Sequence, residues 1–134
     1  ADTGAVIVGL PPGSRHALGA LAFAVAARRA GLPVVYLGAD LPIGDWVAAA
    51  ERVAARAAVI GVVTPADRGP ARRVAEALRD GRPGIVVAFG GRHAPGPGSR
   101  GVEASDRRPG PVRLPEDLVE AVAALESALA SATG

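Results

Sequence analysis

The chain has 134 residues, of which 49% are hydrophobic and 21% charged, so it carries enough apolar material for one globular core and is not a disordered chain. It contains no cysteine, which excludes a disulfide framework, thiol catalysis and thiolate metal sites. Its formal net charge is only +2 although its pI is near 10.3, because every basic residue is Arg. That balance does not indicate a nucleic-acid-binding face.

The sequence shows no targeting or membrane segment. Its longest run of apolar residues and glycine, residues 17–27, is too short to cross a bilayer and ends at Arg28 and Arg29. No cationic segment precedes an apolar one at the amino terminus, so we expect a cytoplasmic protein without a membrane partner. Residues 1–134 fit a single domain. Because the chain begins with Ala1, we expect it to be a piece excised from a longer protein.

The first half of the chain predicts three strands and two helices. Strands are expected where short apolar runs end at proline or glycine, over residues 5–10, 33–38 and 57–63. A helix is expected over residues 15–30, with Gly31 as its C-cap and with buried Leu18, Leu21, Ala22, Val25 and Ala26. A second helix is expected after Asp45, with buried Trp46, Val47, Ala50, Val53 and Ala54.

The second half predicts two more helices and two more strands. A helix over residues 70–80 directs Val74 and Leu78 inward, and a strand over residues 85–89 ends at Gly90-Gly91. Residues 92–111 are rich in Gly, Pro and Arg and predict a long loop to which the sequence assigns no role. A short edge strand is expected over residues 112–114. The last helix is expected over residues 115–130, with Leu118, Val122, Leu125 and Leu129 on its buried stripe.

Short, continuously apolar strands that alternate with amphipathic helices are typical of a parallel sheet covered on both faces. We therefore predict an α/β fold with a doubly wound, parallel, five-stranded sheet. We expect the flavodoxin-like (Rossmann-like) strand order 2-1-3-4-5, in which ligands bind at the carboxyl ends of the strands, beside the first strand. The loops at that edge cover residues 11–19, 38–42 and 63–69, together with the segment from Gly90 onward.

The loop after the first predicted strand carries the candidate ligand-binding residue His16. Neutral imidazole is the commonest protein ligand for a transition metal. Small residues close to it, among them Gly19, would let a bulky ligand approach the backbone. A histidine at the start of a helix also serves purely structural roles, and the residues alone leave both interpretations open.

Five further side chains have ordinary structural interpretations. Trp46 belongs to the core stripe of its helix, Tyr36 packs at the end of a strand, and His93 lies in a solvated loop. Asp40 and Asp67 fall in loops at the carboxyl edge of the sheet, where we expect them to cap helices or to form turns.

Four segments, taken in order, resemble the vitamin B12-binding domain of corrinoid proteins. They are Ser14-x-His16-x-x-Gly19, Val34-Val35-Tyr36-Leu37-Gly38, Ile60-Gly61-Val62-Val63-Thr64 and Phe89-Gly90-Gly91. That family carries Asp-x-His-x-x-Gly first, Ser-x-Leu after the third strand and Gly-Gly after the fourth. The resemblance covers residues 5–130 of the chain.

The resemblance implies that the domain binds cobalamin, with His16 replacing the dimethylbenzimidazole base as lower axial ligand of cobalt. The displaced nucleotide tail would insert between the sheet and a helix, where Gly19 and Gly90-Gly91 leave room. By the same resemblance His16 is the metal ligand, and the cofactor-binding residues are Ser14, Arg15, His16, Gly19, Val63, Thr64, Gly90 and Gly91.

Ser14 is the main departure from the family pattern, which has an acidic residue there that orients the histidine and raises its basicity. A hydroxyl can still accept the imidazole N–H, but a change of this kind typically lowers metal affinity by about 10–100-fold. Either cobalamin binds through a weaker bond between histidine and cobalt, or the domain is a degenerate one that has lost the cofactor.

Three functions remain open. Residues 16–21 and 35–42 look closest to the C-terminal sensory domain of MerR-type transcription regulators, which bind adenosylcobalamin. That role needs an N-terminal DNA-binding domain that this chain lacks, gives the domain no enzymatic activity of its own, and leaves a homo-oligomer open. The alternatives are a corrinoid-carrying domain of a methyltransferase or mutase, and a flavodoxin-like interaction domain without a cofactor.

Overall fold

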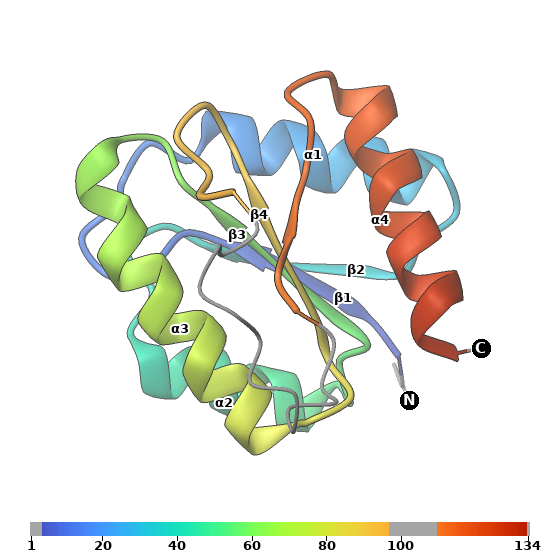
Figure 1. Cartoon of the computed structure of the whole chain (residues 1–134), viewed down its shortest axis with the longest axis horizontal. Coiled ribbons are helices and arrows are strands. Elements are labelled where there is room, and N and C mark those ends of the chain that lie inside the picture. Colours follow the sequence, from blue (N-terminus) through green and yellow to red (C-terminus); the bar gives the residue numbers. More distant parts are fainter. Residues whose placement is uncertain (1–3, 97–109, 134) are drawn as a thin grey trace.

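The computed structural model describes residues 4–96 and 110–133, in which helices flank a five-stranded parallel sheet (Figure 1). The strands are β1 (Val6–Gly9), β2 (Val34–Gly38), β3 (Ala57–Gly61), β4 (Val86–Gly90) and β5 (Val112–Arg113). The helices are α1 (Leu18–Arg29), α2 (Ile43–Arg52), α3 (Arg68–Gly81) and α4 (Leu118–Thr133), with a short 3₁₀ turn, η1 (Pro65–Asp67), before α3. Strands and helices alternate from β1 to β4, as the sequence predicts.

The strands lie in the order β2-β1-β3-β4-β5, and each neighbouring pair is parallel. The predicted order is therefore confirmed. Val8 of β1 lies opposite Tyr36 of β2 on one side and opposite Val59 of β3 on the other. The chain moves from β1 first to one side of the sheet and then to the other. This places the switch point, where such sheets bind ligands, at the carboxyl ends of β1 and β3.

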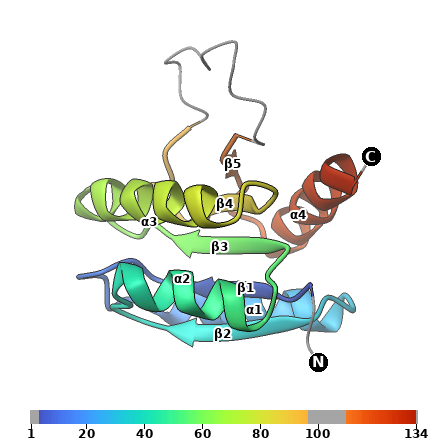
Figure 2. The same ribbon diagram turned by 90° about the horizontal axis from the view of Figure 1, so that it is seen from below.

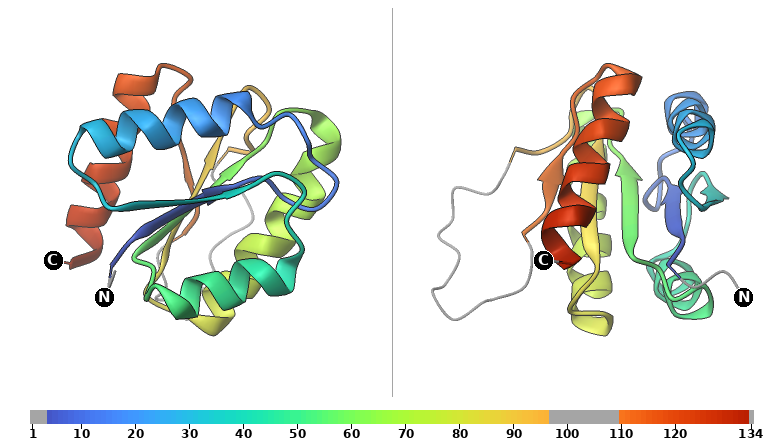
Figure 3. Two further views of the ribbon diagram at one scale, coloured as in Figure 1. Left: turned by 180° about the vertical axis from the view of Figure 1, so that it is seen from behind. Right: turned by 90° about the vertical axis from the view of Figure 1, so that its right-hand side faces the viewer.

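The helices form one layer on each face of the sheet. α1 and α4 cover one face, and α2 and α3 cover the other (Figures 1 and 2). Seen from behind, α1 and α4 again lie on the same side of the strands (Figure 3). Val6 and Val8 face α1 and α4, whereas Ile7 between them faces α2 and α3. Burial on both faces explains why the central strands are apolar throughout.

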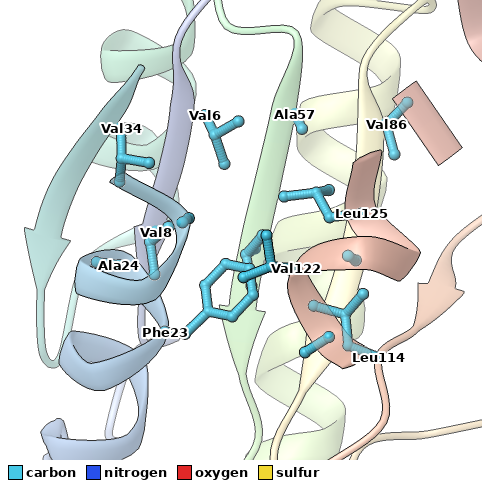
Figure 4. Close-up of a cluster of buried hydrophobic side chains, with 14 of the residues drawn as sticks. Val6, Val8, Phe23, Ala24, Val34, Ala57, Val86, Leu114, Val122 and Leu125 are labelled. Atoms are coloured by element: carbon cyan, nitrogen blue, oxygen red, sulfur yellow. The ribbon is translucent and has the colours of Figure 1, made fainter. Parts of the chain in front are cut away.

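The core beneath α1 and α4 is centred on Phe23 of α1. Figure 4 shows its ring above the sheet, in one buried cluster with Val8 of β1 and Val122 of α4. Burial of one phenylalanine side chain contributes about 1.5–3 kcal/mol. The opposite core contains Trp46, which is fully buried and confirms the structural role expected for it. Val74 and Leu78 of α3 are also buried as predicted.

The predicted buried stripe of the first helix is wrong for its three large residues, although Ala26 does pack against the core. Leu18 is 82% exposed and Leu21 45% exposed, and Val25 also faces solvent. The residues that α1 buries are Phe23, Ala24 and Ala27. An alanine-rich helix has apolar residues on several sides, so their spacing does not decide which side faces the sheet. The large ring of Phe23 and the small alanines beside it fit the sheet better than the leucines do.

All four helices begin away from their predicted starts, although α3 begins only two residues early, at Arg68. α1 begins at Leu18 and not near residue 15, which leaves His16 in the preceding loop. α2 begins at Ile43, so that Asp45 lies inside its first turn. α4 begins at Leu118, because the Asp117 carboxylate accepts the backbone N–H of Glu120 at 3.0 Å and caps the helix there. Leu118 is consequently exposed, whereas Val122, Leu125 and Leu129 are buried as predicted.

Candidate functional site

The loop of residues 10–17, between β1 and α1, is held in place by the loop that follows β2. The Asp40 carboxylate accepts the backbone N–H of Gly13 at 2.7 Å, and the Asp40 backbone N–H donates to the Ser14 carbonyl, also at 2.7 Å. Gly13 has φ +87° and Asp40 has φ +49°, conformations that Gly and Asp adopt more readily than most residues. The Arg15 guanidinium lies 3.7 Å from the Asp40 carboxylate in an exposed ion pair. The loop thus has a defined shape before any ligand arrives.

His16 is the exposed functional group of this loop. It lies two residues before α1, and its imidazole has no hydrogen-bond partner among the described residues. No cluster of three or more His, Cys, Asp or Glu side chains suited to a metal ion occurs in residues 4–96 and 110–133. His16 therefore presents a single imidazole at the carboxyl edge of the sheet, beside the switch point.

Ser14 of this loop forms a buried polar pair with Asp67, which lies after β3. They are the only two buried polar or charged residues of the described part of the chain, at 2% and 6% exposed. The Ser14 hydroxyl donates to Asp67 Oδ2 at 3.1 Å. The same oxygen accepts the backbone N–H groups of Val63 and Thr64, each at 3.0 Å. Ser14 is thus linked to the loop after β3. The sequence analysis did not predict this contact.

A pocket of about 250 Å³ opens between α1, α4 and the carboxyl ends of the central strands. Phe23 of α1 and Leu114, which follows β5, both line it. The remaining lining residues are mostly apolar or glycine, namely Val8, Leu10, Gly19, Ala20, Val59, Gly61, Val63, Gly90, Gly91, Arg92, Pro115, Glu116, Leu118 and Ala121. Its largely apolar lining suits a largely apolar ligand group.

The glycines of this pocket are of two kinds. Gly91 has φ +105°, and a Cβ built on it would lie 2.5 Å from the Val62 carbonyl oxygen, so the fold itself requires glycine there. A Cβ built on Gly19 would meet no atom within 4 Å, and one on Gly90 would make only ordinary contacts. The fold does not require glycine at those two positions. Their missing side chains instead leave space in the pocket.

The structure brings together four of the eight predicted cofactor-binding residues in the wall of this pocket: Gly19, Val63, Gly90 and Gly91. Ser14, Arg15 and His16 lie in the loop of residues 10–17 and do not line it. Thr64 does not line it either, and its backbone N–H is bound by Asp67.

The other side chains singled out in the sequence agree only in part with the structural roles expected for them. Tyr36 packs against the α1 and α4 core as expected. His93 is only partly exposed, and its backbone carbonyl accepts Arg68 Nε at 2.9 Å. Asp40 and Asp67 do shape loops, but both also hold the segment that carries His16. Of the arginines in the predicted loop, Arg100, Arg107 and Arg108 lie outside the described residues.

A larger and more open hollow, of about 490 Å³, lies at the opposite edge of the sheet. Arg56, Arg82 and Ile85 line it near the start of β3 and β4, together with Leu129 and Thr133 of α4. Ligands of open parallel sheets bind at the carboxyl edge and not here. We therefore assign the site to the smaller pocket and the His16 loop.

The fold and this edge of the sheet agree with a known family of domains. A family model for the B12 binding domain matches residues 4–97, which is more than half of the chain. The chain belongs to the B12-binding domain family. The comparison with curated proteins found no match for this chain.

Three solved structures share its fold. One is a cobalamin-binding protein from Desulfitobacterium hafniense DCB-2, at TM-score 0.69 and 19% identity over 94% of this chain and 59% of that one. Another is the methanol:cobalamin methyltransferase complex MtaBC from Methanosarcina barkeri. It has a TM-score of 0.74 and 20% identity over 95% of this chain and 46% of that one. The third is the monomethylamine corrinoid protein of Methanosarcina barkeri. It has a TM-score of 0.66 and 21% identity over 92% of this chain and 57% of that one. The domain thus spans roughly half the length of these proteins.

The residues present fit a cobalamin. The domain offers an exposed imidazole without a hydrogen-bond partner among the described residues, next to a pocket in which two glycines leave out side chains that the fold would accept. None of the described helices is long and apolar enough to span a bilayer.

Proposed function

We propose that this B12-binding domain holds cobalamin with His16 as the lower axial ligand of cobalt and with the nucleotide tail in the pocket between α1 and α4. The observation that carries the proposal is the exposed His16 imidazole, which has no hydrogen-bond partner in the part of the chain that the structure describes and lies beside a pocket of about 250 Å³. When bound, the cofactor would supply a cobalt centre that can carry an alkyl group.

The chain's own residues bind and orient the cofactor. One imidazole nitrogen of His16 supplies the lone pair for cobalt, which requires that the other nitrogen keep its proton. Ser14 and Arg15 flank this ligand in the loop of residues 10–17, and Asp40 fixes the loop backbone. The apolar wall, with Val63, Gly90 and Gly91, excludes water from the tail. Thr64 contributes by its backbone N–H to Asp67, which fixes the loop after β3.

Substitution of the histidine tests this proposal. Mixed with hydroxocobalamin or adenosylcobalamin, the purified protein is expected to give the visible spectrum of a cobalamin whose own base is displaced by histidine. His16→Ala is expected to abolish that spectrum, because no other imidazole lies in the loop of residues 10–17. His93→Ala, at the only other histidine of the chain, serves as the control and is expected to leave it unchanged. A wild-type protein that changes neither cobalamin spectrum would refute the proposal.

We infer two candidate roles for the loaded domain. Likeness of residues 16–21 and 35–42 to MerR-type regulators favours a cytoplasmic, non-enzymatic sensor of adenosylcobalamin, which would contact DNA through a separate N-terminal domain and could act as a homo-oligomer. The similarity in fold to MtaBC and to the monomethylamine corrinoid protein favours a carrier domain in methyl transfer.

The complete gene discriminates between these roles. A helix-turn-helix segment encoded before residue 1 would support the sensor and contradict the carrier. A helical domain in that place, with a methyltransferase encoded alongside, would support the carrier and contradict the sensor.

A further inference from the structure

The buried hydrogen bond between Ser14 and Asp67 links a carboxylate to the loop that carries His16. The two residues are 53 positions apart in the sequence, and their side chains meet at 3.1 Å beneath the carboxyl edge of the sheet. Both are almost completely buried, although the rest of the described core is apolar. A buried carboxylate costs free energy unless it is hydrogen-bonded. Here one oxygen, Oδ2, accepts three donors.

Asp67 is held firmly on its own side of this contact. Its carboxylate accepts the backbone N–H groups of Val63 and Thr64 at 3.0 Å, and it immediately precedes α3. A negative charge at the amino-terminal end of a helix is stabilised by the helix dipole. These contacts fix the carboxylate independently of Ser14. Loop capping by itself would need only an acceptor such as the side-chain oxygen of asparagine, and would not need the charge.

The bond to Asp67 determines what Ser14 can do toward His16. A hydroxyl has one proton to donate and two lone pairs with which to accept. Since the Ser14 proton is directed at Asp67, the hydroxyl oxygen can act toward any other partner only as an acceptor. Hydrogen bonds in a chain polarise one another, and a carboxylate at the end of the chain strengthens the effect. An N–H donated to Ser14 would therefore also be stabilised by the charge on Asp67.

We propose that Asp67 is a positioning residue for His16 and acts on it through the Ser14 hydroxyl. Asp67 would thereby supply, from the loop after β3, the carboxylate that the family pattern places at position 14. This inference rests on the proposed role of His16 as cobalt ligand. In the loaded protein the imidazole N–H that does not face cobalt donates to Ser14, whose proton stays on the bond to Asp67. Ser14 is then no sign of a lost cofactor site, because the charge has moved to a second residue.

Charge removal without loss of hydrogen bonding tests the proposal. In the Asp67→Asn variant, the side-chain oxygen of asparagine can accept hydrogen bonds from the same three donors, but the side chain carries no charge. We expect it to weaken hydroxocobalamin binding by about 10–100-fold, as outer partners of metal-binding histidines do, and to lower the fraction with the histidine-bound spectrum. Ser14→Ala removes the link and leaves the bonds from Asp67 to Val63 and Thr64. We expect a similar loss, and no further loss in the double variant, because both changes interrupt one chain of contacts.

Asp45→Asn is the matched control. It makes the same chemical change on an exposed carboxylate at the start of another helix, α2, and that carboxylate belongs neither to the loop of residues 10–17 nor to the pocket lining. We expect less than a twofold change in affinity.

Exchange of the two residues gives a rescue test. Ser14→Asp combined with Asp67→Ser moves the carboxylate to the position next to His16. We expect this double variant to recover the histidine-bound spectrum, whereas Ser14→Asp alone would place two carboxylates in contact and weaken both folding and binding.

Each outcome bears on the proposal. Wild-type affinity and spectrum in Asp67→Asn would overturn it and leave His16 as a cobalt ligand. If Asp67→Asn does not fold, an unchanged spectrum in Ser14→Ala would overturn it instead. A wild-type protein without the histidine-bound spectrum would refute the proposed function itself, and this inference with it.

Discussion

At the scale of single residues, the space inside the pocket depends on side chains that are absent. Gly19 is the second residue of α1, and it lies one helical turn before Phe23, on the same face of the helix. A side chain at position 19 would therefore project toward the pocket that Phe23 lines. Because a Cβ there would meet no protein atom within 4 Å, the fold does not require glycine at this position, and under the proposed function only the ligand would.

Gly19→Leu is expected to separate folding from binding. Leucine favours a helix over glycine by up to about 1 kcal/mol, so the melting temperature of the cofactor-free protein should stay level or rise. Crowding of a filled site typically costs about 1–3 kcal/mol. Cobalamin affinity, measured by spectral titration, should therefore fall by roughly 5–150-fold.

Gly44→Leu is the control, because Gly44 is likewise the second residue of its helix and likewise has open space around a built Cβ. It lies outside the pocket lining and should bind cobalamin normally. Equal affinity in the two variants would show that the tail does not occupy this pocket.

The sequence made some of these residues predictable and not others. His16, Gly19 and Gly90-Gly91 are recognisable in the sequence because each belongs to a short local pattern of residues. Asp67 does not, because an aspartate after Thr64-Pro65 also has the ordinary role of capping a turn. Its contact with Ser14 arises only when β1 and β3 become neighbours in the sheet, and a sequence pattern does not record contacts between distant loops.

At the scale of whole elements, α1 shows why a stripe of apolar residues does not identify its own buried face. Leu18, Leu21 and Val25 have the spacing of a buried stripe and yet are exposed. Phe23 lies on another side of the same helix and fills the space between the sheet and α4 (Figure 4). The fold class was predictable because alternation of strands and helices is a property of the whole chain. The rotation of one helix about its axis depends on the shape of the surface that it covers.

Two alanine substitutions measure that rotation. Phe23→Ala removes a buried ring and should lower the free energy of unfolding by about 3–5 kcal/mol. Leu21→Ala removes a side chain that is half exposed and should cost less than about 1 kcal/mol. Urea denaturation followed by circular dichroism gives both values. A larger loss in Leu21→Ala than in Phe23→Ala would mean that α1 packs on the sheet through the originally predicted stripe.

At the scale of the whole molecule, the two faces of the sheet have different roles. The face under α2 and α3 is filled around the fully buried Trp46. The face under α1 and α4 contains the pocket at its carboxyl end. α1 and α4 also pack against each other, so a ligand between them and the sheet would contact all three. Bound cobalamin should therefore stabilise the domain as a whole but order mainly one face of it.

Cofactor binding should raise the melting temperature and change hydrogen exchange unevenly. A ligand that binds only the folded state adds about 2.7 kcal/mol when its free concentration is 100 times its Kd, which moves the Tm of a domain of this size by roughly 5–20 °C. Below the melting range, backbone amides of the loop of residues 10–17, the first turns of α1 and α4 and the end of β4 should gain protection from exchange. Amides of α2 and α3 should change little, because these helices lie on the far side of the sheet from the pocket. Protection gained chiefly in α2 and α3 would place the cofactor on the wrong face and contradict the assigned pocket, even if the spectrum showed a bound histidine.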